Sequence, residues 1–268
     1  FKEITLLGQN VDSYLWYGGG LKKDFSKASE IQKASSINFA KLLEMCALTE
    51  PKMRIRFSTS NPQDMSLDVI KVMSKYENIC NYIHLPVQSG SDNILKAMNR
   101  QHTRKEYIKL VENIFQIMPD CSISHDMISG FPNESEQDHL DTLSLMEKVK
   151  YSFGYMFKYS ERPGTPAAKK LEDNIDEETK SRRLSQIVEL QQKHSLYRSK
   201  EFIGKTVEVL IEKESKKSNL HWAGRNQQNT TVVFPKENYN IGDFVNVKIN
   251  SCTSATLIGE AVTFSKNN

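Results

Sequence analysis

The sequence contains few cysteines, and their spacing matches no local metal site. Four occur among the 268 residues: Cys46, Cys80, Cys121 and Cys252. They lie too far apart along the chain for a metal motif, and they are too few for a disulfide framework. We therefore expect no metal site in this chain and interpret the cysteines as reduced structural residues of a cytoplasmic protein.

Long apolar runs and a strong excess of one charge are also missing. No segment approaches the roughly 18 apolar residues of a membrane-spanning helix, and no signal peptide is visible, so we expect no membrane partner. Lys and Arg number 36 against 33 Asp and Glu, which gives a net charge of +3. This weakly basic balance permits a nucleic-acid partner without requiring one.

The motifs of several enzyme classes are absent as well. The sequence has no Walker phosphate-binding loop, no Ser-His-Asp order and no close pair of carboxylates. A barrel lyase or isomerase is disfavoured because such an enzyme needs a paired acid and base. Hydrophobic residues make up 38% of the chain and charged residues 26%, so we expect a packed globular protein.

The chain does contain a repeated unit, in which a strand-like segment ends in a small polar loop and a helical pattern follows. In residues 82–92, Tyr82-Ile83-His84 suits a strand, and the polar residues from Gln88 onward suit a loop that opens a helix. The expected strands are 2–7, 53–57, the first half of 82–92, 122–128 and 153–159. Helices between them predict right-handed crossovers and an α/β fold with a partial parallel (β/α) barrel.

The texture of the sequence changes near residues 200–205. A long, highly charged helix is expected over 176–202, and short alternating segments follow Gly204. The expected short strands are 206–211, 231–234, 244–249 and 255–262. Their close spacing is typical of a small β-barrel. We therefore predict a first domain over 1–202, with a surface insertion over 12–35, and a β-barrel domain over 203–268.

The strand ends of a parallel barrel meet at one mouth, which is where such folds bind ligands. The residues expected there are mostly neutral hydrogen-bonding groups: Gln9, Asn10, Ser58, Ser60, Gln88, Ser89 and Asp126. Such a set suits a polar cofactor that supplies the difficult chemistry itself. Arg100 and Arg162 are candidates to meet a carboxylate or phosphate there, with a solvated surface position as the alternative.

Other candidates have plainer interpretations. Any single polar residue at the mouth is also explained as an ordinary cap or turn residue. His84 and His102 are expected to be structural, and the aromatic residues of 155–159 are expected to lie in the core.

The long helix and the last domain carry basic residues suited to phosphate contact: Arg182, Arg183, Lys205, Lys216, Lys217 and Arg225. Interspersed acids leave a solvated surface as the alternative. A small β-barrel with an exposed aromatic such as Trp222 favours single-stranded RNA as the partner.

Several long motifs, in the same order along the chain, closely resemble the radical S-adenosylmethionine methylthiotransferases. They are Leu6-Leu7-Gly8-Gln9-Asn10-Val11, residues 54–62 (Arg-Ile-Arg-Phe-Ser-Thr-Ser-Asn-Pro), residues 84–91 (His-Leu-Pro-Val-Gln-Ser-Gly-Ser), Met98-Asn99-Arg100, His102-Thr103, Gly130-Phe131-Pro132 and residues 161–168 (Glu-Arg-Pro-Gly-Thr-Pro-Ala-Ala). The match is strongest with the branch that makes 2-methylthio-isopentenyladenosine in tRNA. It spans nearly the whole chain and ends in what resembles a TRAM domain, the RNA-binding β-barrel of that family.

The resemblance implies a reaction, cofactors and partners. In such enzymes a 4Fe–4S cluster reduces S-adenosylmethionine to a 5′-deoxyadenosyl radical, which activates carbon 2 of an isopentenylated adenosine beside the anticodon. A second cluster supplies sulfur and another S-adenosylmethionine supplies the methyl group. The partners implied are the tRNA anticodon stem-loop and an electron donor such as flavodoxin or ferredoxin. The residues proposed for the mouth are then assigned to the cofactor or target-base pocket.

The sequence departs from the family pattern in one respect. It has no CxxxCxxC cluster-binding loop, and residues 2–7 match the strand that follows this loop in the family. We therefore interpret the chain as a fragment that binds no cluster and is inactive alone, although its parent is an enzyme. Relatives that modify threonylcarbamoyladenosine or a ribosomal-protein aspartate remain alternatives, as does a non-catalytic RNA-binding module.

Overall fold

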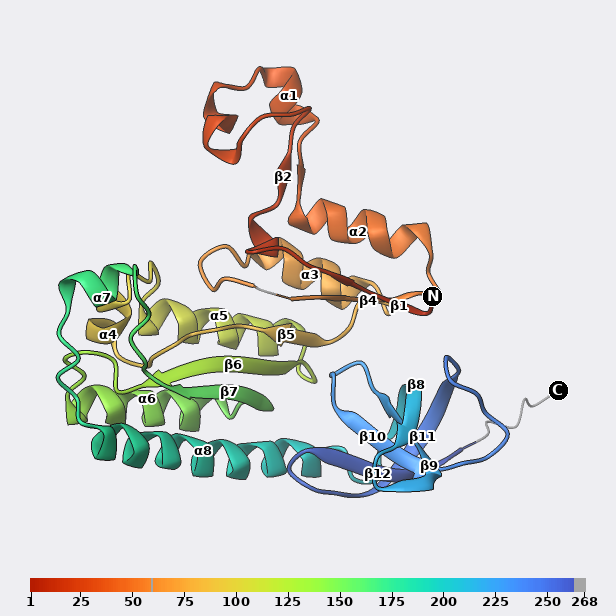
Figure 1. Ribbon diagram of the computed structural model, residues 1–268. Coiled ribbons are helices and arrows are strands. Elements are labelled where there is room, and N and C mark those ends of the chain that lie inside the picture. The colour runs from red at the N-terminus through yellow and green to blue at the C-terminus, as the bar shows by residue number, and fades with distance from the viewer. Residues whose placement is uncertain (59, 263–268) are drawn as a thin grey trace.

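The computed structural model describes residues 1–58 and 60–262 and confirms the predicted fold class (Figure 1). A parallel sheet with helices on one face forms the larger body, and a small closed β-barrel lies beside one end of that sheet. The long helix α8 (Glu177–Lys200) runs along the sheet and ends at the barrel. No helix among the described residues is long and apolar enough to cross a membrane.

The sheet is parallel throughout. Its strands are β1 (Glu3–Leu6), β4 (Arg54–Phe57), β5 (Tyr82–His84), β6 (Ser122–Ser129) and β7 (Phe153–Lys158). β1 pairs with β4, and β6 pairs with both β5 and β7. A parallel bridge between Ile55 and Ile79 joins the two groups, which gives the spatial order β1-β4-β5-β6-β7.

Helices follow the strands, and the longer ones cover one face of the sheet. They are α2 (Phe39–Thr49), α3 (Leu67–Lys75), α4 (Asp92–Ala97), α5 (Arg104–Ile117), α6 (Glu136–Val149), α7 (Pro166–Lys170) and α8. Capping boxes begin α5 at Thr103 and α6 at Ser135, where each hydroxyl accepts a bond from the helix backbone three residues on and the side chain at that position bonds back to the cap. The core lies between these helices and the sheet.

Residues 11–38, which include the predicted insertion, project from the sheet above α2 (Figure 1). They form η1 (Val11–Ser13), β2 (Leu15–Trp16), η2 (Lys22–Lys27), α1 (Glu30–Ala34) and β3 (Ile37–Asn38). β2 and β3 pair antiparallel and form the stem of this projection.

The small barrel contains one strand that the sequence pattern missed. Its strands are β8 (Thr206–Ser215), β9 (Ser218–Arg225), β10 (Thr231–Pro235), β11 (Phe244–Cys252) and β12 (Thr256–Ala261). β9 mixes charged, polar and apolar residues without clean alternation, which explains the omission. The expectation that Trp222 is exposed is wrong, since this side chain packs partly buried against the barrel core beneath Lys236.

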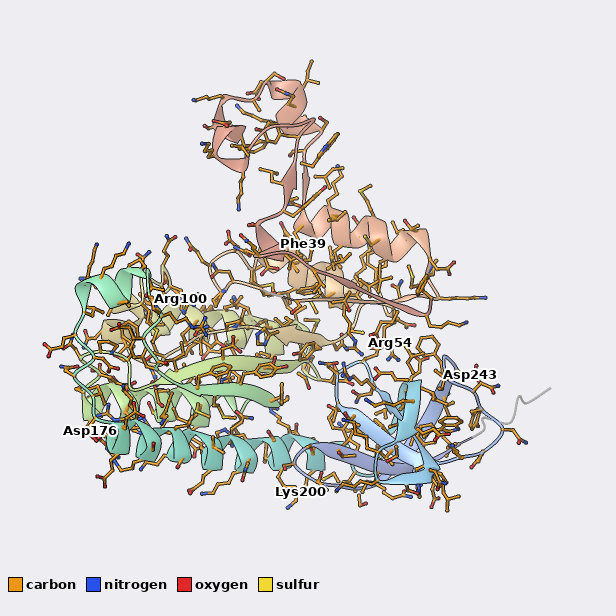
Figure 2. All side chains as sticks on the ribbon, in the orientation of Figure 1. Phe39, Arg54, Arg100, Asp176, Lys200 and Asp243 are labelled. Carbon is orange, nitrogen blue, oxygen red and sulfur yellow. The ribbon has the colours of Figure 1, made fainter. Side chains whose placement is uncertain are left out.

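Two buried arginines of β4 join the sheet to the small barrel, and Figure 2 shows Arg54 between the two bodies. Arg54 donates to the backbone carbonyl of Arg225 at 2.8 Å and to the Glu208 carboxylate at 3.0 Å. Arg56 donates to the carbonyls of Asn226 and Gln227 at 2.7 and 3.1 Å. Both guanidinium groups are nearly inaccessible to solvent, so their hydrogen bonds are made in a low-dielectric contact.

A buried carboxyl group ties together the loops that leave β1 and β4. Asp12 accepts hydrogen bonds from the Ser60 hydroxyl at 3.4 Å and from the Asn61 backbone N–H at 3.1 Å. Burial raises the pKa of Asp12 from 3.8 to about 7, although these two hydrogen bonds oppose the shift. Below about pH 7 the folded protein therefore favours the protonated form of the Asp12 carboxyl group.

We expect the Arg54→Met substitution to loosen the contact between the two domains. It removes charge-assisted hydrogen bonds from a buried site and should lower the free energy of unfolding by about 2 kcal/mol. Thermal denaturation would show this as a melting temperature lower by about 5 °C. Lys52→Met, a change at a neighbouring exposed lysine, is the control. Equal melting temperatures for the two variants would contradict the role of Arg54.

Asp12 should also make stability depend on pH. Its contribution is fully present below the unfolded pKa of 3.8 and is lost as the pH rises through about 7. Between pH 5 and pH 8 the loss should be about 3 kcal/mol, because roughly two pH units separate pH 5 from the folded pKa and each is worth about 1.4 kcal/mol. Urea denaturation at these two pH values measures how far the free energy of unfolding falls. This fall should be correspondingly smaller in Asp12→Asn than in wild type, whereas the exposed control Asp68→Asn should show the full wild-type fall. If Asp12→Asn loses as much free energy of unfolding between the two pH values as wild type does, Asp12 is not the group responsible.

Candidate functional site

A cavity of about 650 Å³ opens where β6 and β7 reach their carboxyl ends. Its polar lining includes Gln88, Asp126 and Arg162, and its apolar lining includes Ile128, Phe131 and Phe157. The mixture of apolar walls and a few convergent polar groups is typical of a small-molecule site. The position at the carboxyl end of parallel strands is where this class of fold binds ligands.

Gln88 reaches the cavity through a strained backbone. Its φ is +75°, a left-handed conformation that a residue with a side chain rarely adopts. Two hydrogen bonds to β6 hold it there: its N–H donates to the Asp126 carbonyl at 2.9 Å, and its carbonyl accepts from the Ile128 N–H at 3.0 Å. Strain held by neighbouring structure is common at ligand sites, and this outlier is consistent with one.

Asp126 belongs to a row of polar side chains on the face of the sheet opposite the helices, which we call the open face. The Ser124 hydroxyl lies 2.7 Å from the Tyr82 hydroxyl and 2.8 Å from Nδ1 of His84. Nε2 of His84 lies 3.4 Å from Oδ1 of Asp126. Oδ1 is buried and makes no hydrogen bond with a described residue. A buried carboxylate oxygen in this condition is suited to a cationic ligand group.

The turn after β6 needs glycine at Gly130. Its φ is +72°, and a Cβ there would lie 2.3 Å from Cγ of Lys180. The Gly130 N–H donates to the Glu134 carboxylate at 2.8 Å, and Arg183 donates to the same carboxylate at 2.8 Å. Burial raises the pKa of Glu134, while the Gly130 N–H and the Arg183 charge oppose that rise. This buried ion pair fixes the turn that places Phe131 in the cavity wall.

The structure brings together part of the cofactor set predicted from the sequence. Gln88, Asp126 and Arg162 line the cavity. Arg100 interacts electrostatically with Asp126 and lies at the end of the sheet far from the small barrel (Figure 2). Gln9 is exposed in the loop after β1, and its side chain is not among the residues that line the cavity.

Other members of that set have structural partners. The Asn10 amide donates to Asp64 at 2.6 Å, and the Ser60 hydroxyl bonds Asp12. Ser89 is fully buried beneath α6, where its hydroxyl lies 3.2 Å from the Thr142 hydroxyl, so its assignment to the pocket is a correction. Ser58 is half-buried in the loop after β4 and lies outside the cavity lining.

The sequence pattern did not indicate that aromatic side chains of β7 lie exposed on the open face. Residues 155–159 were expected in the core, but Tyr155 and Phe157 are each 51% exposed on the open face. β7 alternates, and its partners in register on β6 are Asp126 beside Tyr155 and Ile128 beside Phe157. The polar alternate residues of β6 were the signal that could have placed these aromatics on an open face.

The predicted RNA-binding residues divide into two groups. Lys216, Lys217 and Arg225 border one groove of about 530 Å³ on the small barrel. Lys205 is exposed near the domain junction, where it lies over the Phe202 ring. Arg182 lies on α8 and pairs with Glu136 at 2.8 Å. Arg183 is a correction: its side chain is 5% exposed and holds Glu134, so it has no surface for a phosphate.

Two of the four cysteines, Cys80 and Cys121, are poorly suited to bind an iron–sulfur cluster. Burial raises the pKa of Cys80 to about 12 and raises that of Cys121 further, which keeps both thiols protonated, whereas metals bind thiolates. No group of three or more His, Cys, Asp or Glu residues within 1–58 and 60–262 is arranged to hold a metal ion. Ligands for a cluster would therefore have to come from outside the described residues.

Comparisons with known proteins agree with this architecture. The profile of the Radical SAM superfamily matches residues 2–146, and that of the TRAM domain matches residues 200–262. The chain is 72% identical over 268 residues to the tRNA-2-methylthio-N(6)-dimethylallyladenosine synthase of Christiangramia forsetii, covering 100% of this chain and 56% of the relative. It is 69% identical, with the same coverage, to the protein of that name from Flavobacterium johnsoniae.

Among solved structures, coproporphyrinogen III oxidase from Escherichia coli, a radical SAM enzyme, superposes with a TM-score of 0.48 at 13% identity over 75% of this chain and 52% of that chain. The chain thus spans about 56% of the length of the curated relatives that it matches. It belongs to the radical SAM superfamily, and its C-terminal β-barrel is a TRAM domain.

Proposed function

We propose that this chain is part of a tRNA methylthiotransferase, which transfers a methylthio group to carbon 2 of an isopentenylated adenosine beside the anticodon. The observation that carries the proposal is the 72% identity, over every residue of the chain, to a synthase named for that product. The cavity at the strand ends and the basic groove on the TRAM domain support the proposal, because they are candidates for a cofactor site and an RNA-binding surface. Such an enzyme works in the cytoplasm, where tRNA is found.

S-Adenosylmethionine is the cofactor proposed for the cavity. When bound with a 4Fe–4S cluster, it supplies a radical that activates the target carbon. The apolar walls formed by Ile128, Phe131 and Phe157 suit the flat adenine base. The buried Oδ1 of Asp126 suits the cationic end of the molecule, and Arg162 at the rim suits its carboxylate.

The rest of the machinery has to come from elsewhere. The thiols of this chain do not provide cluster ligands, so we propose that this chain alone is inactive. The complete enzyme would take its cluster ligands from the remainder of the protein and its electrons from a donor such as flavodoxin or ferredoxin. In this arrangement the chain's own residues bind and orient the cofactor and the RNA.

The substrate is tested by mass spectrometry of tRNA nucleosides. Deleting the complete gene should abolish the 2-methylthio-isopentenyl nucleoside, and the complete gene should restore it. A plasmid encoding residues 1–268 alone should leave the unthiolated isopentenyl nucleoside in place. Persistence of the methylthio nucleoside in the deletion strain would rule out the proposed activity. Loss of a threonylcarbamoyl derivative, or of the ribosomal-protein modification, would point to the related enzymes.

The cofactor site is tested by titration of S-adenosylmethionine into the complete protein with its clusters reconstituted. Asp126→Asn keeps the shape of the side chain but removes its charge, and it should weaken binding by about tenfold or more. Arg162→Ala should also weaken binding, because it removes the positive charge proposed to contact the cofactor carboxylate. Asp68→Asn, an exposed change on α3, is the matched control and should bind as wild type does. If both site variants bind S-adenosylmethionine with wild-type affinity, this cavity is not the cofactor site.

A further inference from the structure

A second cavity, of about 270 Å³, lies between the sheet and the TRAM domain. Ser122 and Phe153, at the amino ends of β6 and β7, line it from the sheet side together with Tyr82 and Tyr155. Gln228 and Asn229, from the loop between β9 and β10, line it from the TRAM side. We call this space the interdomain cleft. It opens toward the end of the strands opposite the cofactor cavity, and the roles proposed so far leave it without a ligand.

Two large aromatic side chains are exposed beside the cleft. Phe153 is 46% exposed and Tyr155 is 51% exposed, and their rings meet edge to face with centroids 4.9 Å apart. Neighbouring exposed aromatics on a rigid strand are costly in water and commonly mark a binding surface. A flat ligand that stacks on the Tyr155 ring would remove this apolar area from water.

The TRAM side of the cleft is polar, and its shape is fixed before any ligand binds. The Thr230 N–H donates to Oδ1 of Asn226 at 2.8 Å, which closes the loop that carries Gln228 and Asn229. Arg225 borders the cleft and is exposed, and its guanidinium contacts with Glu212 at 3.7 Å and with Asn229 at 3.4 Å are long. The Gln228 amide N–H donates to Asp120 at 3.0 Å, which orients the side chain and leaves its amide oxygen to accept. An oriented amide beside a guanidinium suits the edge of a nucleobase and a phosphate.

The cleft lies between the two sites already proposed. Arg225 borders both the cleft and the basic groove that contains Lys216 and Lys217. On the other side, Tyr155 borders the cleft while Phe157 lines the cofactor cavity. Two residues along a strand span about 6.6 Å, whereas successive bases in a stacked strand lie about 3.4 Å apart. The spacing of the two aromatics is close to two such steps, so one strand of an unpaired RNA loop can reach both rings, and proteins commonly stack the bases of such loops on aromatic side chains.

We propose that the interdomain cleft binds an unpaired base of the substrate RNA, close along the strand to the base that reacts. The base stacks on Tyr155, the amides of Gln228 and Asn229 contact its edge, and Arg225 contacts the adjoining phosphate. The cavity is smaller than the roughly 300–1,000 Å³ of drug-sized ligand sites, which suits a single base. This inference rests on the proposed function, because it takes RNA as the substrate.

A segment of the longer protein is the competing occupant, since the chain spans 56% of its relatives' length. Charge favours RNA: Arg225 lines the cleft and also borders the groove that contains Lys216 and Lys217, so a phosphate backbone can continue from one to the other. The buried centre of a protein interface is instead depleted of charged residues.

The test measures binding of the complete protein to a fluorescein-labelled anticodon stem-loop RNA by fluorescence anisotropy, at one fixed salt concentration. Tyr155→Ala should weaken binding by about tenfold, and Tyr155→Phe should bind as wild type does because its ring remains. Trp16→Ala removes a comparably exposed ring, 48% accessible, from β2 in the projection above α2 and is the matched control. A 2-aminopurine placed in the RNA loop should be quenched by wild type and less so by Tyr155→Ala.

Each outcome decides between the occupants. If Tyr155→Ala binds RNA as tightly as wild type and quenches 2-aminopurine equally, the cleft does not hold a base, and the proposed function still stands. If the variant instead melts well below wild type in the complete protein, another segment covers the ring and the inference is overturned. If the wild-type protein binds no stem-loop RNA at all, both the inference and the proposed tRNA substrate fail.

Discussion

The arrangement of the whole chain depends on two buried guanidinium groups that cross a domain boundary. Arg54 and Arg56 leave the open face of β4 and bond carbonyl groups of residues 225–227, and Arg54 also meets Glu208. Glu3 on the neighbouring strand lies 3.0 Å from Nε of Arg56 and partly offsets the buried charge. The planar guanidinium group of arginine has five N–H donors, so one side chain can donate to several carbonyl groups at once. The loop after β9 is thereby fixed against the amino ends of the strands.

This contact also determines which surfaces remain available. The helices occupy one face of the sheet, and the TRAM domain covers the amino end of the other, so the open face is left exposed toward the carboxyl ends of the strands. That exposed part contains Asp126, Tyr155 and Phe157. The interdomain cleft shares Arg225 with the basic groove, and its Tyr155 is two residues along β7 from Phe157 of the cavity proposed for the cofactor.

The many charged residues of helix α8 suggest a surface for RNA, but its buried cations instead have structural roles. Lys180 is buried and its ammonium lies 2.6 Å from Asp173, and Arg183 is buried against Glu134. His125 of β6 meets Gln191 at 2.8 Å on the same side of the helix, and burial lowers the pKa of that histidine to about 4, so it is neutral. The buried cations of α8 therefore brace the turn beside the cofactor cavity. A buried ion pair that loses one partner is costly, so these residues are fixed by structure rather than by RNA.

The sequence by itself determined the local elements and the fold class. Strand-like segments, polar strand ends and the helical patterns between them act within a few residues, so they identified five parallel strands with helices between them. It also indicated the turn at Gly130, where only glycine tolerates the backbone and the close approach of Lys180. Residue pattern was sufficient here because these features depend on neighbours along the chain.

The tertiary structure alone decided which of these residues share a site. Ser89 and Arg183 have the composition of functional residues, yet contacts with Thr142 and Glu134, 53 and 49 residues away, commit them to the interior. Tyr155 and Phe157 have the composition of core residues, yet β7 leaves them on a face that no helix covers. A side chain's role depends on which distant element meets it, and that is fixed only when strand order and domain docking place the elements in space.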